Sequence, residues 1–169
     1  MVKAKPLPPV ELLRELFSYD PETGVVKRLK ATSNRLKVGD TVGYVNEGDG
    51  YLRFSLNGQV IKVHRLVWKL QTGEEPPQEI DHENRDRTDN KWCNLRAATY
   101  GQNQSNKSYP RGKYLPGARR TKEGAWFAAC HREHIGMASS EEHAHELYKE
   151  HHAKKYGEFS PYWPAPAPR

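Results

Sequence analysis

The segment 79–107 is densely polar, and its few apolar residues leave room only for short elements. Residues 79–82 read as a short strand, and residues 95–98 read as a second strand that returns after a polar loop. The polar residues between the strands, Asn90 among them, are ordinary turn formers. Residues 100–107 read as a short helix. The whole segment therefore predicts a β–loop–β–helix unit.

The side chains on this unit suit a divalent metal. Asp81 and His82 end the first strand and Asn103 lies on the helix, so the unit could place the three residues face to face. Carboxylate and amide oxygens are hard ligands that match Mg²⁺ or Mn²⁺, and one Asp with one Asn suffices because Mg²⁺ keeps several waters and takes substrate phosphate oxygens. A neighbouring His, with an ordinary pKa of about 6.5, suits the removal of a proton from water. These parts together predict hydrolysis of a phosphodiester.

A spaced pattern extends over residues 51–107. It consists of Val63-His64-Arg65-Leu66-Val67-Trp68, then Asp81-His82, then Asn94-Leu95-Arg96, then Asn103 and Asn106. This pattern resembles the HNH (ββα-metal) endonucleases, and most closely their homing-type members associated with phage and introns.

The resemblance to the HNH endonucleases implies a role for each matching residue. His82 would be the general base, and Asp81 and Asn103 would be the metal ligands. Asn94 would hold the loop of the motif together. Asn103 stands where many members carry the last His, and this variant removes an imidazole ligand.

Several residues near the motif keep two interpretations. His64 opens a helix. It could cap or pack the helix, or it could contact a DNA phosphate. Arg65 and Arg96 are candidate contacts to DNA phosphates, although an exposed Arg is most often only solvated. Trp68 and Trp92 are predicted to belong to the core rather than to stack on bases.

The chain before this pattern reads as short elements joined by turns. We expect a helix at residues 11–17, a strand at 25–29 and two hairpins within 41–64. Asn57-Gly58 lies between alternating strands, which is a strong hairpin signal because both central positions need φ > 0. Residues 64–70 read as a helix that Gly73 ends.

The C-terminal segment 115–159 carries a second pattern. It has Gly117 before a basic strand, Trp126 in a second strand, His134-Ile135-Gly136 in a third, and a helix at 141–156 followed by Gly157-Glu158-Phe159. The pattern resembles the ethylene-response-factor (APETALA-type) DNA-binding domain. The resemblance implies a three-stranded antiparallel sheet packed on one helix, with the exposed sheet face in the major groove. The side chains expected to contact DNA are Arg119, Arg120, Lys122, Trp126 and Arg132.

Three local features of this segment carry their own expectations. Ser139 with Glu142 predicts a capping box at the start of the helix. Around residues 137–139 the chain departs from the family, because the third strand and its connection are expected to be short. The histidines of the helix read as solvated rather than as metal ligands; they are His143, His145, His151 and His152.

Composition narrows the class of protein. Hydrophobic residues make up only 36% of the chain, which favours small modules with thin cores. The net charge of +6 points toward a polyanionic partner. Two cysteines, Cys93 and Cys130, cannot build a disulfide framework, so a reduced, cytoplasmic setting is expected, the host cytoplasm if the chain is phage-encoded. No apolar run approaches the length of a membrane span, so no membrane partner is expected.

These observations predict a modular α+β protein. Its expected parts are a support region at 1–50, an HNH nuclease domain at 51–108, a linker at 109–114, a sheet–helix DNA-binding domain at 115–159 and a disordered Pro-rich tail at 160–169. The expected function is hydrolysis of double-stranded DNA with Mg²⁺ or Mn²⁺, by a monomer or a homodimer that nicks or cuts. One alternative is a non-catalytic, sequence-specific DNA-binding protein that keeps a decayed nuclease unit. An RNA-directed protein is less favoured, because A-form grooves exclude side chains.

Overall fold

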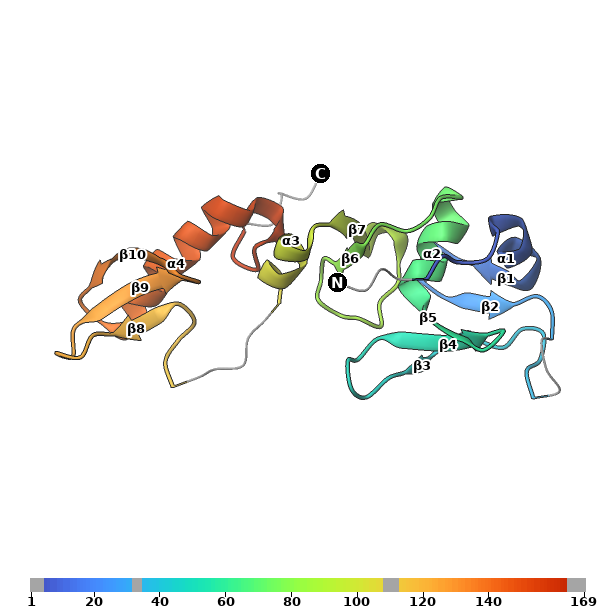
Figure 1. Ribbon diagram of the computed structural model, residues 1–169, viewed down its shortest axis with the longest axis horizontal. Coiled ribbons are helices and arrows are strands. Elements are labelled where there is room, and N and C mark those ends of the chain that lie inside the picture. The colour runs from blue at the N-terminus through green and yellow to red at the C-terminus, as the bar shows by residue number, and fades with distance from the viewer. Residues whose placement is uncertain (1–4, 32–34, 108–112, 164–169) are drawn as a thin grey trace. The chain divides into compact units, whose positions relative to one another are not determined.

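The computed structural model describes residues 5–31, 35–107 and 113–163 (Figure 1). Two units make up the chain, Met1–Tyr100 and Gly101–Arg169. Both contain helices and antiparallel strands, so the fold class is α+β, as predicted. Within the described residues, no helix is both long and apolar enough to cross a bilayer.

The first unit begins with a helix and a two-stranded sheet. Helix α1 (Val10–Leu16) leads directly into strand β1 (Phe17–Tyr19), which pairs antiparallel with β2 (Val26–Arg28). Phe17 belongs to the strand rather than to the helix, where it buries its ring edge-to-face against Phe54 with the centroids 5.4 Å apart. The predicted helix and strand are therefore confirmed, with the end of the helix one residue earlier.

A three-stranded antiparallel sheet follows, in the order β3-β4-β5. Its strands are β3 (Tyr44–Val45), β4 (Leu52–Leu56) and β5 (Gln59–Lys62). Asn57 has φ 50° and Gly58 has φ 76°, so the two-residue turn between β4 and β5 has the backbone that the hairpin signal predicts.

Helix α2 (Val63–Thr72) covers this sheet. Its buried apolar side chains recur at helical spacing; they are Val63, Leu66, Val67 and Leu70. Gly73 ends the helix with φ 81° and donates its N–H to Lys69 O at 2.9 Å, as predicted.

One hydrophobic core extends through the first unit. It gathers buried side chains from Leu7 to Leu95, and Trp68 and Trp92 pack against it, as predicted, with their ring centroids 5.2 Å apart. Apolar residues of the segment 1–50 are buried against those that follow it, as the Phe17–Phe54 contact illustrates. The predicted boundary at residue 50 therefore lies inside one packed core.

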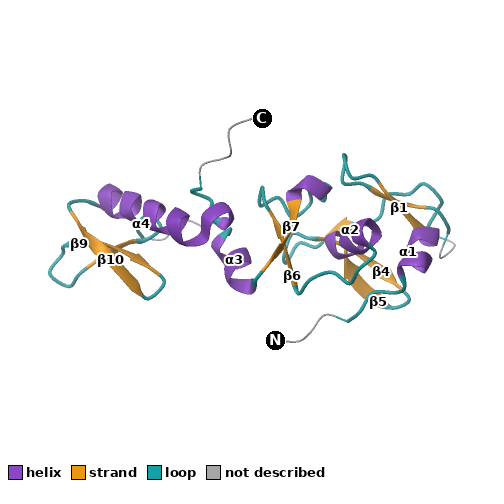
Figure 2. Cartoon of the chain, turned by 90° about the horizontal axis from the view of Figure 1, so that it is seen from above, coloured by secondary structure: helices purple, strands orange, loops and turns teal. Residues whose placement is uncertain are grey.

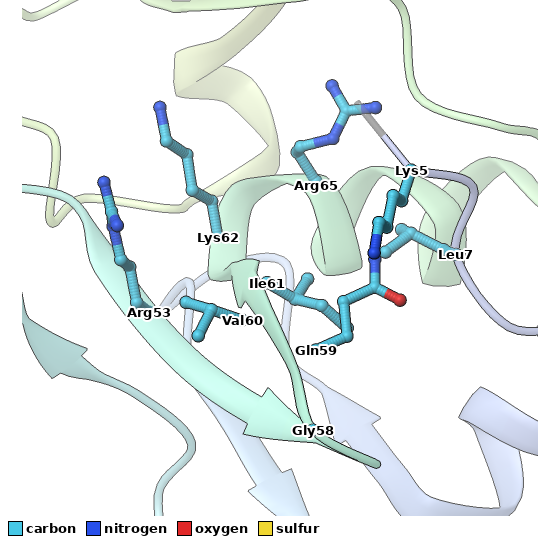
Figure 3. Close-up of a pocket in the computed structure, with 9 residues that line it drawn as sticks. All are labelled: Lys5, Leu7, Arg53, Gly58, Gln59, Val60, Ile61, Lys62 and Arg65. Carbon is cyan, nitrogen blue, oxygen red and sulfur yellow. The ribbon is translucent and has the colours of Figure 1, made fainter. Parts of the chain in front are cut away.

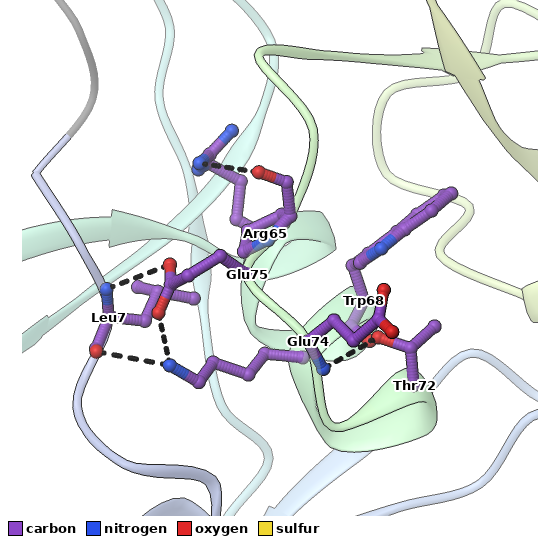
Figure 4. A network of polar contacts seen from close by, with 8 residues as sticks. Leu7, Arg65, Trp68, Thr72, Glu74 and Glu75 are labelled. Carbon is purple, nitrogen blue, oxygen red and sulfur yellow. Dashed lines mark hydrogen bonds and ion pairs between the residues drawn. The ribbon is translucent and has the colours of Figure 1, made fainter.

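Polar contacts beneath α2 fix the chain that precedes α1. The buried Lys69 ammonium pairs with the Glu75 carboxylate and donates to Leu7 O at 3.2 Å, while Leu7 N donates to Glu75 Oε2 at 3.3 Å (Figure 4). On the same helix, Arg65 Nη1 donates to Pro77 O at 2.9 Å. These contacts fasten the residues on either side of the helix to it.

Two strands complete the first unit. Strand β6 (Glu79–His82) pairs antiparallel with β7 (Leu95–Ala98), and the short 3-10 helix η1 (Trp92–Asn94) leads into β7. Both strands are confirmed at their predicted bounds.

The second unit packs a sheet on one long helix. Its elements are α3 (Tyr100–Ser105), β8 (Ala118–Arg120), β9 (Trp126–Cys130), β10 (Glu133–Ala138), α4 (Glu141–Tyr156) and the 3-10 helix η2 (Gly157–Phe159). The antiparallel sheet has the order β10-β9-β8, and Figure 2 shows α4 lying over β9 and β10.

Small residues let α4 approach this sheet closely. Ala118, Ala128 and Ala144 form the buried centre. Gly117 has φ 81°, and a Cβ there would lie 2.0 Å from Tyr148 Cγ, so the tyrosine ring occupies the space that a side chain would need.

Two expectations for this unit are corrected. The N-cap of α4 is Ser140, whose Oγ accepts a hydrogen bond from His143 N at 3.1 Å, whereas Ser139 contacts the His143 ring. The third strand is not short, because β10 spans six residues with a register irregularity between His134 and Gly136.

The predicted disordered tail at 160–169 begins too early. Ser160 is buried, and the ring of Tyr162 packs on that of His152 with the centroids 5.6 Å apart. Residues 164–169 and the predicted linker residues 109–112 lie outside the described residues.

Candidate functional site

Two chemically active side chains stand together at the end of β6. Asp81 is 3% exposed and His82 is 4% exposed. In the antiparallel ladder Asp81 lies opposite Arg96 and His82 lies opposite Leu95 on β7. The pairing of these strands therefore brings three of the predicted site residues into one place.

Arg96 holds the Asp81 carboxylate. Its Nε donates to Asp81 Oδ2 at 2.9 Å, and its Nη2 lies 2.8 Å from the same oxygen. Both side chains are largely buried, so the pair lies in a medium of low dielectric, where a charge-assisted bond fixes orientation strongly. The sequence suggests Arg96 as a phosphate contact, and the structure gives its guanidinium a carboxylate partner.

His82 is held from the other side of the loop. Asn90, which is 1% exposed, has its Oδ1 3.2 Å from His82 Nε2, and its Nδ2 donates to Thr88 O at 3.3 Å. Burial lowers the pKa of His82 below its ordinary value, and the bond to Asn90 and the Asp81 charge offset only part of that effect. The imidazole is therefore neutral at neutral pH.

Two rings pack against His82. The His64 ring centroid lies 5.2 Å from that of His82, and the Tyr51 centroid lies 5.0 Å from His64 and 5.8 Å from His82. Burial, followed by the neighbouring His82, lowers the pKa of His64 well below its ordinary value. The N-cap of α2 is Lys62, so of the roles considered for His64 the structure shows packing, not capping.

The Asn94 side chain contacts the start and the middle of the loop between β6 and β7. Its Oδ1 accepts a hydrogen bond from Asn84 N at 2.9 Å, and its Nδ2 donates to Asp89 O at 2.7 Å. Its backbone carbonyl also accepts from Glu83 N at 3.0 Å. One side chain thus ties the loop that carries Asn90 to the strand pair.

The N-terminal segment supports the same loop. Tyr19 Oη donates to Asn90 O at 2.9 Å, and Trp92 N donates to Pro21 O at 3.1 Å. Gly24 has φ 74°, and a Cβ there would lie 2.6 Å from Lys91 N. The turn after β1 therefore presses directly against the loop.

Arg65 and Asn103 lie on helices, α2 and α3, rather than on the strand pair. Arg65 is half-buried, and its guanidinium donates to Pro77 O. Asn103 lies on α3 and belongs to the second unit, where α3 is tied to η2 by a 3.2 Å bond from Ser105 Oγ to Phe159 O.

The predicted donors fit a divalent cation by their chemistry. Asp81 offers a carboxylate whose orientation Arg96 fixes, and Asn103 offers an amide oxygen; both are the hard oxygen donors that Mg²⁺ and Mn²⁺ prefer. In the described part of the chain, no three His, Cys, Asp or Glu side chains form a cluster that could hold a metal. With so few protein ligands, Mg²⁺ would keep waters and take substrate phosphate oxygens.

The sheet of the second unit distributes the expected DNA-contacting residues over two faces. Arg119 lies opposite Phe127, whereas Arg120 lies opposite Trp126, and successive residues of a strand point to opposite faces. Trp126 packs with the small core against α4, with Arg120 Cζ 5.2 Å from its ring centroid. The two arginines therefore point to opposite faces of the sheet, and Arg120 shares its face with Trp126. Lys122 and Arg132 lie in exposed turns.

The histidines of α4 differ in exposure and in their contacts, although the sequence predicts that they are solvated. His152 is buried, and its Nδ1 lies 2.8 Å from Ser160 Oγ, so this residue is not solvated. Exposed His143 contacts Ser139, and His151 lies 3.3 Å from the Glu133 carboxylate.

Sequence reasoning missed two residues of the site. Asn90 reads as an ordinary turn former, and Tyr51 lies in the segment 41–64 where the sequence predicts two hairpins. Their contacts with His82 distinguish them, and neither residue belongs to a spaced motif that could reveal it.

One comparison with known proteins covers this part of the chain. Residues 62–105 match the family model described as HNH endonuclease. The match contains β6, β7 and the loop between them, so it supports the HNH part of the resemblance. It ends before β8 and does not bear on the C-terminal resemblance. No curated protein and no solved structure is similar enough to the chain to count as a match.

Proposed function

We propose that this protein is a divalent-metal-dependent endonuclease that hydrolyses phosphodiester bonds of double-stranded DNA. The observation that carries the proposal is the buried Asp81–His82 pair, with Asp81 held by Arg96 and His82 held by Asn90, inside the residues that match the HNH endonuclease model. The net charge of +6 also favours a polyanionic substrate.

His82 is the general base of this proposal. Because Asn90 Nδ2 donates to Thr88 O, Asn90 Oδ1 is left to accept from His82 Nε2. Nε2 then carries the ring proton, and Nδ1 is the nitrogen that takes a proton from the attacking water. The lowered pKa of His82 keeps the ring in its basic, neutral form at neutral pH.

Asp81 and Asn103 are the proposed ligands of Mg²⁺ or Mn²⁺. The metal, when bound, supplies charge stabilisation for the departing 3′ oxygen. Arg96 keeps the Asp81 carboxylate in one orientation, and Asn94 keeps the loop that carries Asn90 closed on the strand pair. These two residues position the reacting groups and need not touch the substrate.

The second unit is proposed to bind duplex DNA in a homing-type enzyme. Its exposed cations are candidates for phosphate contact; they are Arg119, Arg120, Lys122 and Arg132. A chain with one catalytic unit handles one strand at a time. We therefore expect a monomer to nick, and a double-strand cut to need a homodimer or a second encounter.

The test is cleavage of supercoiled plasmid with Mg²⁺ or Mn²⁺. Wild type should convert it to nicked or linear DNA, and chelation of the metal should stop the reaction. His82→Ala should leave the plasmid supercoiled, whereas His143→Ala, which removes an exposed histidine of the second unit, should cleave as wild type does. A wild type that binds plasmid but leaves it intact under both metals would refute the proposal in favour of a non-catalytic DNA-binding protein.

Asp81→Asn and Asn103→Ala test the proposed ligands. Each variant should need more metal to reach half of its maximal cleavage rate. Asp81→Asn loses the negative charge of the carboxylate, and Asn103→Ala loses the amide oxygen donor. An unchanged metal requirement in one variant would remove that residue from the ligand set.

A further inference from the structure

A basic groove lies beside the β4–β5 hairpin of the first unit. It has a volume of about 430 Å³, and four of the nine residues that line it are cationic: Lys5, Arg53, Lys62 and Arg65. The other lining residues are neutral. Figure 3 shows the Arg53, Lys62 and Arg65 side chains rising from the same side of the hairpin and the adjoining helix.

Two of these cations face each other directly across the hairpin. Arg53 on β4 and Lys62 on β5 are register partners, so both point to the same face. Like charges in this arrangement destabilise a sheet, and here a carboxylate offsets them: Asp49 Oδ2 lies 2.5 Å from Arg53 Nη2 and 3.9 Å from Lys62 Nζ. The fold thus keeps a repulsive pair in place by means of one shared counter-ion.

The positive charge continues from the groove to the candidate site. Lys62 Nζ lies 3.9 Å from the ring centroid of Tyr51, and Arg87 Cζ lies 5.0 Å from the same centroid. The Tyr51 ring in turn packs on His82. The Tyr51 ring therefore lies between Lys62, one of the groove cations, and the proposed general base His82.

We propose that this groove binds the sugar–phosphate backbone of the DNA strand that His82 cleaves, an inference that rests on the proposed nuclease function. Among the described residues that line the groove, none is an aromatic on which a base could stack, and the apolar ones are aliphatic, including Leu7, Val60 and Ile61. Its cations suit phosphate oxygens, which fix register without reading sequence. Asp49 competes with the phosphates for Arg53 and Lys62, so it limits the affinity of the groove.

The experiment measures duplex binding against salt concentration. It uses full-length protein carrying His82→Ala, a fluorescent DNA duplex and EDTA, so that no cleavage interferes. The groove variant is Arg53→Gln/Lys62→Gln. Its matched control, Lys27→Gln/Lys37→Gln, removes two charges from exposed positions of the same unit.

Each phosphate contact contributes about 0.9 to the slope of log affinity against log salt, or about eightfold in affinity at 0.1 M salt. The groove variant should therefore lose up to about 60-fold in affinity and about 1.8 in slope. The control should stay within about twofold of the parent, because its cations lie outside the groove.

Asp49→Asn gives the opposite sign, which misfolding cannot imitate. Removal of the counter-ion should raise duplex affinity and steepen the salt dependence, while the amide oxygen can still accept the hydrogen bond from Tyr51 N. Loss of affinity in this variant would contradict the inference.

The outcomes separate this inference from the proposed function. If wild type leaves plasmid intact but the groove variants change duplex affinity as expected, the groove stands and the nuclease proposal fails. If wild type cleaves but groove and control variants bind duplex equally well, the groove inference is overturned. It is also overturned if the parent does not bind duplex, or if the groove variant loses affinity only for RNA.

Discussion

Acidification should destabilise the second unit through His152. This side chain is 3% exposed, its Nδ1 lies 2.8 Å from Ser160 Oγ, and its ring lies 4.5 Å from that of Tyr156. Burial, followed by the nearby His131, His151 and Lys155, lowers the pKa of His152 to about 4. The unfolded chain has the ordinary value of about 6.5.

The sign follows from where the proton binds. Below about pH 6.5 the unfolded state takes up a proton that the folded unit refuses, so stability present above that pH is lost as the pH falls toward 4. The difference between the two pKa values corresponds to about 3 kcal/mol once the pH is below both, and to about 2 kcal/mol at pH 5.

Urea unfolding of the full chain at pH 8 and pH 5, followed through the NMR signal of the Trp126 indole, reports on this unit. His152→Asn keeps an amide atom near the position of Nδ1 but does not titrate. It should unfold more easily at pH 8, because it loses the ring contacts, and the wild-type advantage should shrink by about 2 kcal/mol at pH 5. If wild type is more stable than His152→Asn by the same free energy at both pH values, the argument is refuted. The contributions of the other titrating groups are common to both proteins and cancel in this difference.

Three further substitutions test the packing and the loop. Leu66→Ala, at a fully buried position, should cost the first unit about 2–5 kcal/mol in urea unfolding, and a cost below 1 kcal/mol would contradict the single core. Gly117→Ala should destabilise the second unit by about 2 kcal/mol or more, because its Cβ would collide with Tyr148 at a positive φ; wild-type stability would show that α4 moves freely. Asn94→Ala should lower plasmid cleavage at least tenfold with an unchanged circular dichroism spectrum, because the loop loses two hydrogen bonds; full cleavage would show that the loop needs no such tie.

Local patterns predicted most of the elements. The Asn57-Gly58 turn, the Gly73 helix end and the strands β6 and β7 follow from backbone preference and spacing, which act over a few residues. The choice between Ser139 and Ser140 as N-cap depends on one residue of register, which spacing alone does not determine.

Long-range contacts account for what the sequence did not reveal. Leu7 and Leu95 belong to one core, and no local signal shows that the segment 1–50 packs into the unit that follows it. Burial likewise decides that Asn90 holds His82 and that His152 is not solvated. The opposite faces of Arg119 and Arg120 follow from strand alternation, which becomes informative once the strand bounds are known.

The contact of the Pro21–Gly24 turn with the loop at 90–92 limits how genes of this kind can be recombined. A crossover placed near codon 50 would take the Pro21–Gly24 turn from one parent and the loop at 90–92 from another. The close approach of Gly24 to Lys91 N would then join residues of different parents. A crossover near codon 100, at the boundary of the two units, takes the Pro21–Gly24 turn and the loop at 90–92 from the same parent. Chimeras with exchanged C-terminal units should therefore fold more often than chimeras with exchanged N-terminal segments.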